Sequence, residues 1–359
     1  MAGSISSTAV IRFDRCNESG LKEMFGYKED IGPQSSLEKS RKTGEYMYET
    51  MNMQGSMGGV ENVPGLKHHM LQVCGGPLSV YEAGSQDRPA VVMLHGAMYD
   101  EARFIWDQMF PFLSGDYHLF ALDTPRHGKS RPWQGFLDRP RLMDILDNTF
   151  SQLGLERFSL VGLSMGGGLS IEYASLHPEK VSAMVLFEPG GLGDKVDMEF
   201  ITWLYIKTPG MLRLLSRQYI KSDHKAMGKT LQSIYVGGST PTDPDRLIAI
   251  LEDEVKGKYQ NAENDMDDWQ LSGIGPLKVK WNLLNKIPLI NCPSLWLRGA
   301  DSVLVKQYEM ERAVKLASDA GMQAELAIIP NAGHILPLER PQQANAIVKA
   351  FLDNHIRAI

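Results

Sequence analysis

The chain has 359 residues, a formal net charge of -6 and a pI near 5.9, with 43% hydrophobic and 22% charged residues. This composition is that of a folded globular protein and excludes a disordered or disulfide-rich chain. The length suits one enlarged domain that carries an insertion. The net negative charge argues against nucleic acid and anionic lipid as partners.

The number and spacing of the cysteines and the lack of a long apolar run indicate where in the cell the protein is expected. Cys16, Cys74 and Cys292 are far apart, form no metal-type pair and leave one thiol unpaired under any disulfide scheme. No apolar run approaches the roughly 20 residues that span a bilayer, and no basic region precedes the apolar stretch at the N-terminus. We therefore predict a cytoplasmic protein without a membrane span.

Residues 1–62 mix charged residues with Ser, Gly and Met and show no strong periodicity, which predicts an N-terminal extension. Residues 37–53 could form a helix. Acidic residues throughout the first 45 positions argue against a transit peptide. Such an extension is expected to pack on the core or on the partner subunit of a homo-oligomer.

From residue 63 onward, short apolar runs bounded by Gly, Pro or Asp alternate with longer amphipathic segments. Several runs are continuously apolar, which is typical of parallel strands covered by helices on both faces. The pattern predicts an α/β fold with a mostly parallel eight-stranded sheet. The predicted strands are His69–Cys74, Leu78–Ala83, Ala90–Leu94, His118–Asp123, Phe158–Gly162, Val181–Glu188, Ser294–Arg298 and Ala324–Ile329.

Residues 192–287 interrupt this alternation because they contain no convincing strand. Three stretches there have helical periodicity, at Glu199–Ile220, Lys225–Tyr235 and Arg246–Lys256. We interpret residues 192–287 as a helical cap, or lid, inserted into a core formed by residues 63–191 and 288–359.

The segment FSLVGLSMGGGLS leads from an apolar strand directly into a helix, and Gly162 and Gly166 flank Ser164. A serine hydroxyl can attack a carbonyl only if it projects into the cleft. A sharp strand-to-helix turn achieves this with a strained backbone, which needs small residues two positions before and after the serine. Taken alone, G-x-S-x-G is a weak signal. Its place between a strand and a helix makes Ser164 the candidate nucleophile.

A serine nucleophile needs a base and a carboxylate that orients the base. His334 follows the last predicted strand in a Gly-containing loop and is the candidate base. Two carboxylates, Asp301 and Glu188, end strands after Ser164. The chain order Ser164, Asp301, His334 matches nucleophile, acid and base in this arrangement, so Asp301 is favoured and Glu188 is the alternative acid.

Two backbone N–H groups are expected to stabilise the oxyanion. Met165 begins the helix after Ser164, where the helix dipole favours negative charge. Ala97, in the loop after the strand Ala90–Leu94, is the expected second donor. His95 in this loop is assigned a structural role, and His127 a role in loop packing.

These blocks together resemble the α/β-hydrolase superfamily. The resemblance rests on HGA at 95–97, DTPRHGKS at 123–130, GLSMGG at 162–167, RGAD at 298–301 and GHILPLERP at 333–341, and it covers about residue 64 to the end. It points to the lidded esterase, lactonase and carbon–carbon hydrolase branches, in which Ser-Asp-His hydrolysis without a cofactor is usual. Relatives commonly read D-x-P-G-x-G-x-S where this chain has Arg126 in place of the first glycine, which adds a cation near the cleft rim.

The predicted activity is hydrolysis of a carboxylic ester or lactone through an acyl-enzyme on Ser164. Carbon–carbon bond hydrolysis or acyl transfer would use the same residues, and a catalytically quiet ligand-binding receptor is the non-enzymatic alternative. Aromatic residues and Met in the cap favour a hydrophobic small-molecule substrate, with Met98, Trp203 and Trp269 as candidate binding residues. No P-loop, dinucleotide motif or metal-ligand spacing occurs in the sequence, so no cofactor and no metal are expected.

Overall fold

The computed structural model describes residues 10–12, 59–193, 199–208, 211, 224–234, 240–241, 243–276, 279–280 and 282–356. The predicted helix at residues 37–53 lies outside the described residues. Within them, no helix is long and apolar enough to cross a membrane.

All eight predicted strands form, with ends shifted by at most two residues, and they lie in one sheet with a ninth strand. The additional strand β1 (Val10–Arg12) comes from the segment predicted to lie outside the core and pairs in parallel with β9. A stretch of three residues is too short to show periodicity, which explains why the sequence did not predict it. The others are β2 (Lys67–Val73), β3 (Gly76–Ala83), β4 (Ala90–Leu94), β5 (His118–Asp123), β6 (Phe158–Leu163), β7 (Val181–Phe187), β8 (Ser294–Gly299) and β9 (Ala324–Ile329).

The strand order is β1-β9-β8-β7-β6-β4-β5-β3-β2. Among the described strands, the pairs β2–β3 and β3–β5 are antiparallel, and all other neighbouring pairs are parallel. After β4 the chain first adds β5 on one side and then places β6 on the other side of β4. In parallel α/β sheets, such a reversal of strand order opens a crevice at the carboxyl ends of the strands. The loop after β4 and the turn after β6 therefore meet there.

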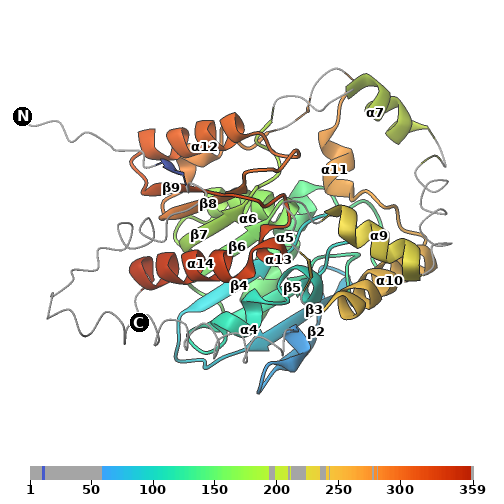
Figure 1. Cartoon of the computed structure of the whole chain (residues 1–359), viewed down its shortest axis with the longest axis horizontal. Coiled ribbons are helices and arrows are strands. Elements are labelled where there is room, and N and C mark those ends of the chain that lie inside the picture. The colour runs from blue at the N-terminus through green and yellow to red at the C-terminus, as the bar shows by residue number, and fades with distance from the viewer. Residues whose placement is uncertain are drawn as a thin grey trace, which may run out of the picture.

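The sheet divides two apolar layers, and alternation along the strands decides which layer each side chain enters. Val91 and Met93 of β4 join one buried cluster, whereas Val92 and Leu94 join the other. The two layers of helices are visible in Figure 1. One face carries α3 (Ala102–Ile105), α4 (Met109–Leu113), α13 (Leu336–Glu339) and α14 (Pro341–His355), and the other carries α5 (Arg139–Gln152), α6 (Met165–Leu176) and α12 (Gln307–Asp319).

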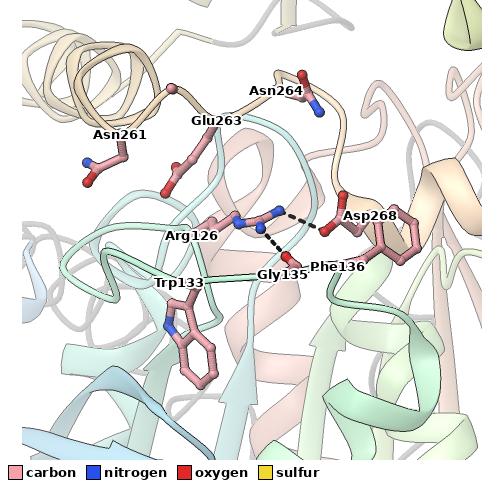
Figure 2. Close-up of a pocket in the computed structure, with 9 residues that line it drawn as sticks. Arg126, Trp133, Gly135, Phe136, Asn261, Glu263, Asn264 and Asp268 are labelled. Carbon is pink, nitrogen blue, oxygen red and sulfur yellow. Dashed lines mark hydrogen bonds and ion pairs between the residues drawn. The ribbon is translucent and has the colours of Figure 1, made fainter.

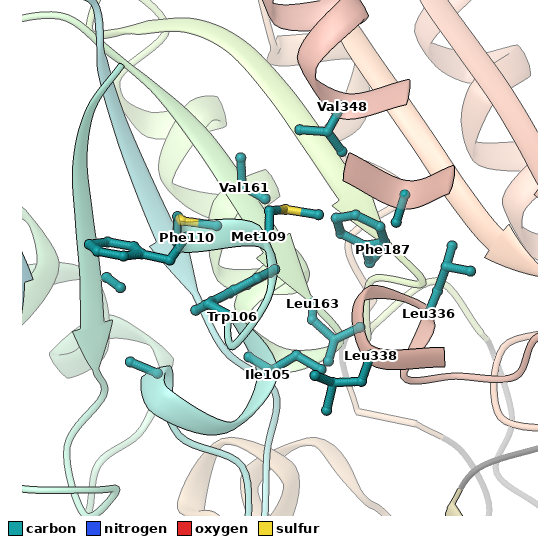
Figure 3. Packing of buried hydrophobic residues seen from close by; sticks show 14 of the residues in the cluster. Ile105, Trp106, Met109, Phe110, Val161, Leu163, Phe187, Leu336, Leu338 and Val348 are labelled. Atoms are coloured by element: carbon teal, nitrogen blue, oxygen red, sulfur yellow. The ribbon is translucent and has the colours of Figure 1, made fainter. Parts of the chain in front are cut away.

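Close packing of the first layer places α3 and α4 directly against the strands that lead to the candidate site (Figure 3). The rings of Trp106 and Phe187 lie 6.3 Å apart between centroids at an angle of 55°. Val161 and Leu163 of β6 belong to the same buried cluster. Dense packing of this kind supports a strained turn at the end of β6, because little space remains for the turn to relax.

The inserted segment, residues 192–287, contains helices and no named strand among its described residues. The predicted helical stretches 225–235 and 246–256 correspond to α9 (His224–Ile234) and α10 (Pro244–Gln260), with residue 235 outside the described residues. Of the predicted stretch 199–220, the first part forms α7 (Glu199–Lys207), and most of the remainder lies outside the described residues. The helix α11 (Asp268–Gly273) and the short 3-10 helix η3 (Ile287–Leu289) were not predicted. Another 3-10 helix, η2, spans Val60–Asn62. Figure 1 shows α7, α9, α10 and α11 gathered on one side of the molecule. Leu247 and Ile248 of α10 join the first apolar layer of the core.

Candidate active site

The turn at Ser164 has the strained geometry that the sequence predicts. Ser164 lies between β6 and α6 with φ 51° and ψ -111°, a backbone conformation that L residues rarely adopt. A Cβ atom on Gly162 would lie 2.5 Å from the carbonyl oxygen of Gly166, and one on Gly166 would overlap the carbonyl oxygen of Leu94. Both positions therefore require glycine. Ser164 itself is half-buried, so its side chain remains accessible.

Backbone hydrogen bonds connect this turn to the end of β7. The N–H of Ser164 donates to the carbonyl oxygen of Phe187 at 2.9 Å, and the N–H of Gly190 donates to the carbonyl oxygen of Ser164 at 2.8 Å. Glu188 lies between these two positions and has φ 42°. The turn at Glu188 is thus held directly against the turn at Ser164.

His334 forms its carboxylate contact with Glu188. Nδ1 of His334 lies 2.8 Å from Oε2 of Glu188. The carboxylate is 1% exposed and also accepts hydrogen bonds from the hydroxyl of Ser302 at 2.5 Å and the N–H of Gly299 at 3.0 Å. Because the carboxylate accepts the hydrogen on Nδ1, Nε2 is left as the basic nitrogen. Among the described residues, Nε2 has no hydrogen-bond partner.

The structure does not bring Asp301, the favoured acid, to His334. Asp301 is exposed, and its N–H donates to the carbonyl oxygen of Ala332 at 2.9 Å. The preceding Arg298 is buried and donates to four carbonyl oxygens at the end of β8 and in the loop after it, among them that of Ser302 at 2.7 Å. These hydrogen bonds hold the loop in a conformation in which Asp301 is exposed to solvent and the hydroxyl of Ser302 reaches Glu188. The alternative acid is the one with the required contact.

The hydroxyl of Ser164 makes no hydrogen bond to His334 among the described residues. Their proximity follows instead from the contacts that run from Ser164 through Phe187 and Glu188 to the imidazole ring. In hydrolases without substrate, this hydrogen bond is often long or poorly aligned and shortens only when substrate binds.

The predicted oxyanion donors lie on two segments that meet at the crevice. The N–H of Gly166 donates to the carbonyl oxygen of His95 at 3.0 Å, which joins the start of α6 to the loop after β4. A Cβ on Gly96 would lie 3.6 Å from the Cβ of Ser164. The N–H groups of Met165 and Ala97 donate to no other group of the described residues. Both are therefore available for a substrate oxygen.

His95 has a structural environment, as predicted. It is fully buried, its Nδ1 lies 2.7 Å from the carbonyl oxygen of Gly96, and its Nε2 accepts the N–H of Thr124 at 2.9 Å. Burial lowers the pKa of His95, so the ring is neutral. It joins the loop after β4 to the loop after β5.

Arg126 keeps the backbone conformation that a glycine would adopt, with φ 67°. Its guanidinium group donates to Asp268 at 2.7 Å and to the carbonyl oxygen of Gly135 at 2.5 Å. Figure 2 shows these contacts beside a cavity of about 260 Å³ that is also lined by Trp133 and Glu263. Arg126 is therefore a contact between the core and the inserted segment rather than a solvated surface residue.

The three candidate binding residues differ in position. Trp269, on α11, is 7% exposed, and its ring would lie 2.7 Å from a Cβ on Gly190, beside the nucleophile turn. Met98 is exposed, and its N–H donates to Asp267 at 2.8 Å. Trp203, on α7, packs against Phe200 with ring centroids 5.9 Å apart. Of the three, Trp269 has a contact beside the nucleophile turn, and Met98 is joined through its N–H to Asp267, two residues before Trp269.

Comparison with known proteins identifies the family. A family model described as the alpha/beta hydrolase fold matches residues 89–341. The chain belongs to this family. The match includes the turn at Ser164, the loop after β4 and both members of the Glu188–His334 pair.

Relatives within the family carry out different reactions. The chain is 25% identical to the carboxylesterase YbfK of Bacillus subtilis, over 79% of this chain and 86% of the relative. It is 24% identical to a 2-hydroxy-6-oxononadienedioate/2-hydroxy-6-oxononatrienedioate hydrolase of Comamonas testosteroni, over 74% of this chain and 88% of the relative. The crystal structure of the carboxylesterase CesB (YbfK) matches with a TM-score of 0.60 at 21% identity and covers 88% of this chain and 100% of that one. These likenesses support hydrolase activity in this chain.

Proposed function

We propose that the protein is a serine hydrolase that cleaves a carboxylic ester or lactone through an acyl-enzyme on Ser164. The observation that carries this proposal is the strained Ser164 turn held against the turn at Glu188, whose buried carboxylate contacts His334. Glu188, rather than Asp301, is the proposed acid. An imidazole that is oriented by a carboxylate at Nδ1 and has no partner at Nε2 among the described residues can serve as the base for a serine nucleophile.

In the proposed mechanism, Oγ of Ser164 attacks the carbonyl carbon while Nε2 of His334 takes its proton. The N–H groups of Ala97 and Met165 stabilise the oxyanion of the tetrahedral intermediate. As the carbon–oxygen bond breaks, His334 returns the proton to the leaving alkoxide, which departs as an alcohol or, for a lactone, stays joined to the acyl group. Water then attacks the carbonyl carbon of the acyl-enzyme and gives a proton to Nε2 of His334. As the bond between the acyl carbon and Oγ of Ser164 breaks, His334 returns this proton to Oγ, which releases the carboxylic acid and restores the free serine.

The inserted segment is proposed to act as a cap that contributes to substrate selection. Trp269 stands beside the nucleophile turn on α11 and offers an apolar wall. This favours a hydrophobic acyl or alcohol group at that position.

Carbon–carbon bond hydrolysis is the second candidate, and the relative from Comamonas testosteroni is the observation that favours it. It would use the same three side chains. A panel of 4-nitrophenyl esters, aryl lactones and dienone acids assayed with the same protein distinguishes the two, because the preferred class has the highest kcat/KM.

Substitution of the nucleophile tests the proposal. Ser164→Ala is expected to lower kcat for 4-nitrophenyl butyrate by about 10³-fold or more. A fluorophosphonate probe should form an adduct on Ser164 that mass spectrometry locates in the wild-type protein only. Unchanged turnover in the variant would refute the assignment, and absence of the adduct in the wild type would favour a quiet ligand-binding receptor.

A further inference from the structure

Asp267 connects the inserted segment to the loop that carries a proposed oxyanion donor. It stands immediately before α11, and its Oδ2 accepts the N–H of Met98 at 2.8 Å. Its Oδ1 lies 2.9 Å from Nε2 of His127, which belongs to the loop after β5. One carboxylate from the inserted segment thus bridges two core loops at the crevice.

The geometry around His127 makes this histidine a cation. Nδ1 lies 2.8 Å from the carbonyl oxygen of Asp100, which can only accept a hydrogen bond, and Nε2 faces the carboxylate of Asp267. Both ring nitrogens therefore carry hydrogens. His127 is 1% exposed, so this charge is compensated inside the protein.

Asp267 is its charged partner. Although burial raises the pKa of Asp267, the positive charges of His127 and Lys258 hold it well below its usual range. Nζ of Lys258 lies 3.4 Å from Oδ1 of the same carboxylate. The acceptor for the N–H of Met98 is thus a fully charged carboxylate, which forms a stronger hydrogen bond than a neutral group.

Three successive N–H groups in the loop after β4 have different partners. The N–H of Gly96 donates to Asp100 at 2.5 Å, and that of Met98 donates to Asp267. Only the N–H of Ala97, between them, has no acceptor among the described residues. Met98 also has φ 67°, a strained conformation that persists only where surrounding contacts impose it.

We propose that Asp267 and His127 are positioning residues for the oxyanion hole. Asp267 fixes the backbone of Met98 and thereby the preceding peptide group, which carries the N–H of Ala97, while His127 fixes Asp267. The inference rests on the proposed function. The site is complete only when the start of α11 lies on the core, so the inserted segment contributes to the chemical step as well as to substrate selection.

The charges in this arrangement are consistent with such a role. An uncompensated carboxylate beside the hole would repel the developing oxyanion. Asp267 is compensated by His127 and Lys258. Burial raises the pKa of Asp100 well above its usual range, which favours the uncharged form of its carboxyl group.

Asp268 provides a matched control because it is the next residue and is also a buried carboxylate of the inserted segment. It binds the core through Arg126 at 2.7 Å and the N–H of Leu137 at 2.8 Å, but makes no contact with the loop after β4 among the described residues. Loss of Asp268 would loosen the inserted segment without removing an acceptor from that loop.

The test compares Asp267→Ser and Asp268→Ser in the full chain. Serine keeps a residue that is favoured before a helix but is too short and uncharged to replace the carboxylate. For 4-nitrophenyl butyrate, we expect D267S to lower kcat by about tenfold or more with KM within about threefold, because transition-state stabilisation is lost. Inhibition by phenylboronic acid, which forms a tetrahedral adduct, should weaken in proportion to kcat, while D268S should keep both values within about threefold.

Two further variants complete the design. Asp267→Asn retains an oxygen acceptor for the N–H of Met98 and should recover most of kcat relative to D267S. If D267S does not fold, D267N carries the test through its kcat and boronate affinity, both expected within about fivefold of the wild type because the acceptor remains.

The inference is overturned if D267S and D268S lower kcat equally, if D267S leaves boronate affinity unchanged, or if D267N loses as much kcat as Ser164→Ala. A wild-type protein that neither hydrolyses esters nor labels at Ser164 would instead refute the proposed function. The two failures are therefore distinguishable.

Discussion

Two histidines at the crevice are each bound to a carboxylate, yet their environments suit opposite tasks. His334 donates to Glu188 through Nδ1 and leaves Nε2 without a partner among the described residues. His127 has an acceptor at both nitrogens and is closed off from solvent. A contact with a carboxylate therefore does not by itself identify a catalytic base. The partner of the second nitrogen decides whether the ring can exchange a proton or serves as a fixed cation.

The largest expected effect concerns the first of these pairs. Glu188→Gln should lower kcat by about 10³-fold, because the amide no longer enforces the tautomer in which Nε2 of His334 is basic. Folding should change little, since glutamine has nearly the same shape. The measurement is steady-state hydrolysis of 4-nitrophenyl butyrate together with thermal unfolding.

Asp301→Asn is the control for this prediction, because Asp301 ends the neighbouring strand and points to solvent. Its kcat should stay within about twofold of the wild type, as expected for a surface substitution. A large loss in D301N with full activity in E188Q would restore Asp301 as the acid.

The second prediction compares the two pairs by stability. A double-mutant cycle with His127→Gln and Asp267→Asn should give a coupling free energy of unfolding of about 2 kcal/mol, because the pair consists of two buried opposite charges. The equivalent cycle with His334→Gln and Glu188→Gln should give a smaller coupling of about 1 kcal/mol, because the partly exposed ring makes one hydrogen bond to the carboxylate. Urea unfolding at pH 7 measures both, and equal coupling would contradict the proposed difference in charge.

The fold was largely predictable because its signals are local. Buried parallel strands are continuous apolar runs, and the turn at Ser164 combines two required glycines with a strand and a helix. The acid was harder to predict, because Glu188 and Asp301 both end adjacent parallel strands. Three features distinguish the two carboxylates: the hydrogen bonds of Arg298 to the loop, the hydroxyl of Ser302 that donates to Glu188, and the backbone turn at Glu188. None of them can be recognised from the spacing of residues in the sequence.

Asp267 could not have been predicted for the same reason. The N–H that it binds belongs to a residue 169 positions away in the chain, and His127 is 140 positions away. Contacts of this range depend on how the inserted segment packs on the core, and side-chain periodicity carries no information about that packing. The one local signal in this region was Arg126, which precedes His127 and departs from the pattern of the family. That departure did not point to Asp267.

The smallest expected effect concerns Arg126, which directly precedes His127 and makes a second ion pair between the core and the inserted segment. Its φ of 67° costs an ordinary residue about 1 kcal/mol, which Arg126→Gly would remove together with the ion pair to Asp268. The two changes oppose each other, so R126G should unfold with a free energy within about 1 kcal/mol of the wild type.

Arg126→Ala loses the ion pair and keeps the strain, and should be less stable than R126G by about 1 kcal/mol. Urea unfolding of the three proteins measures this order. If R126A were the more stable variant, glycine in the relatives would not be explained by the backbone conformation of this loop.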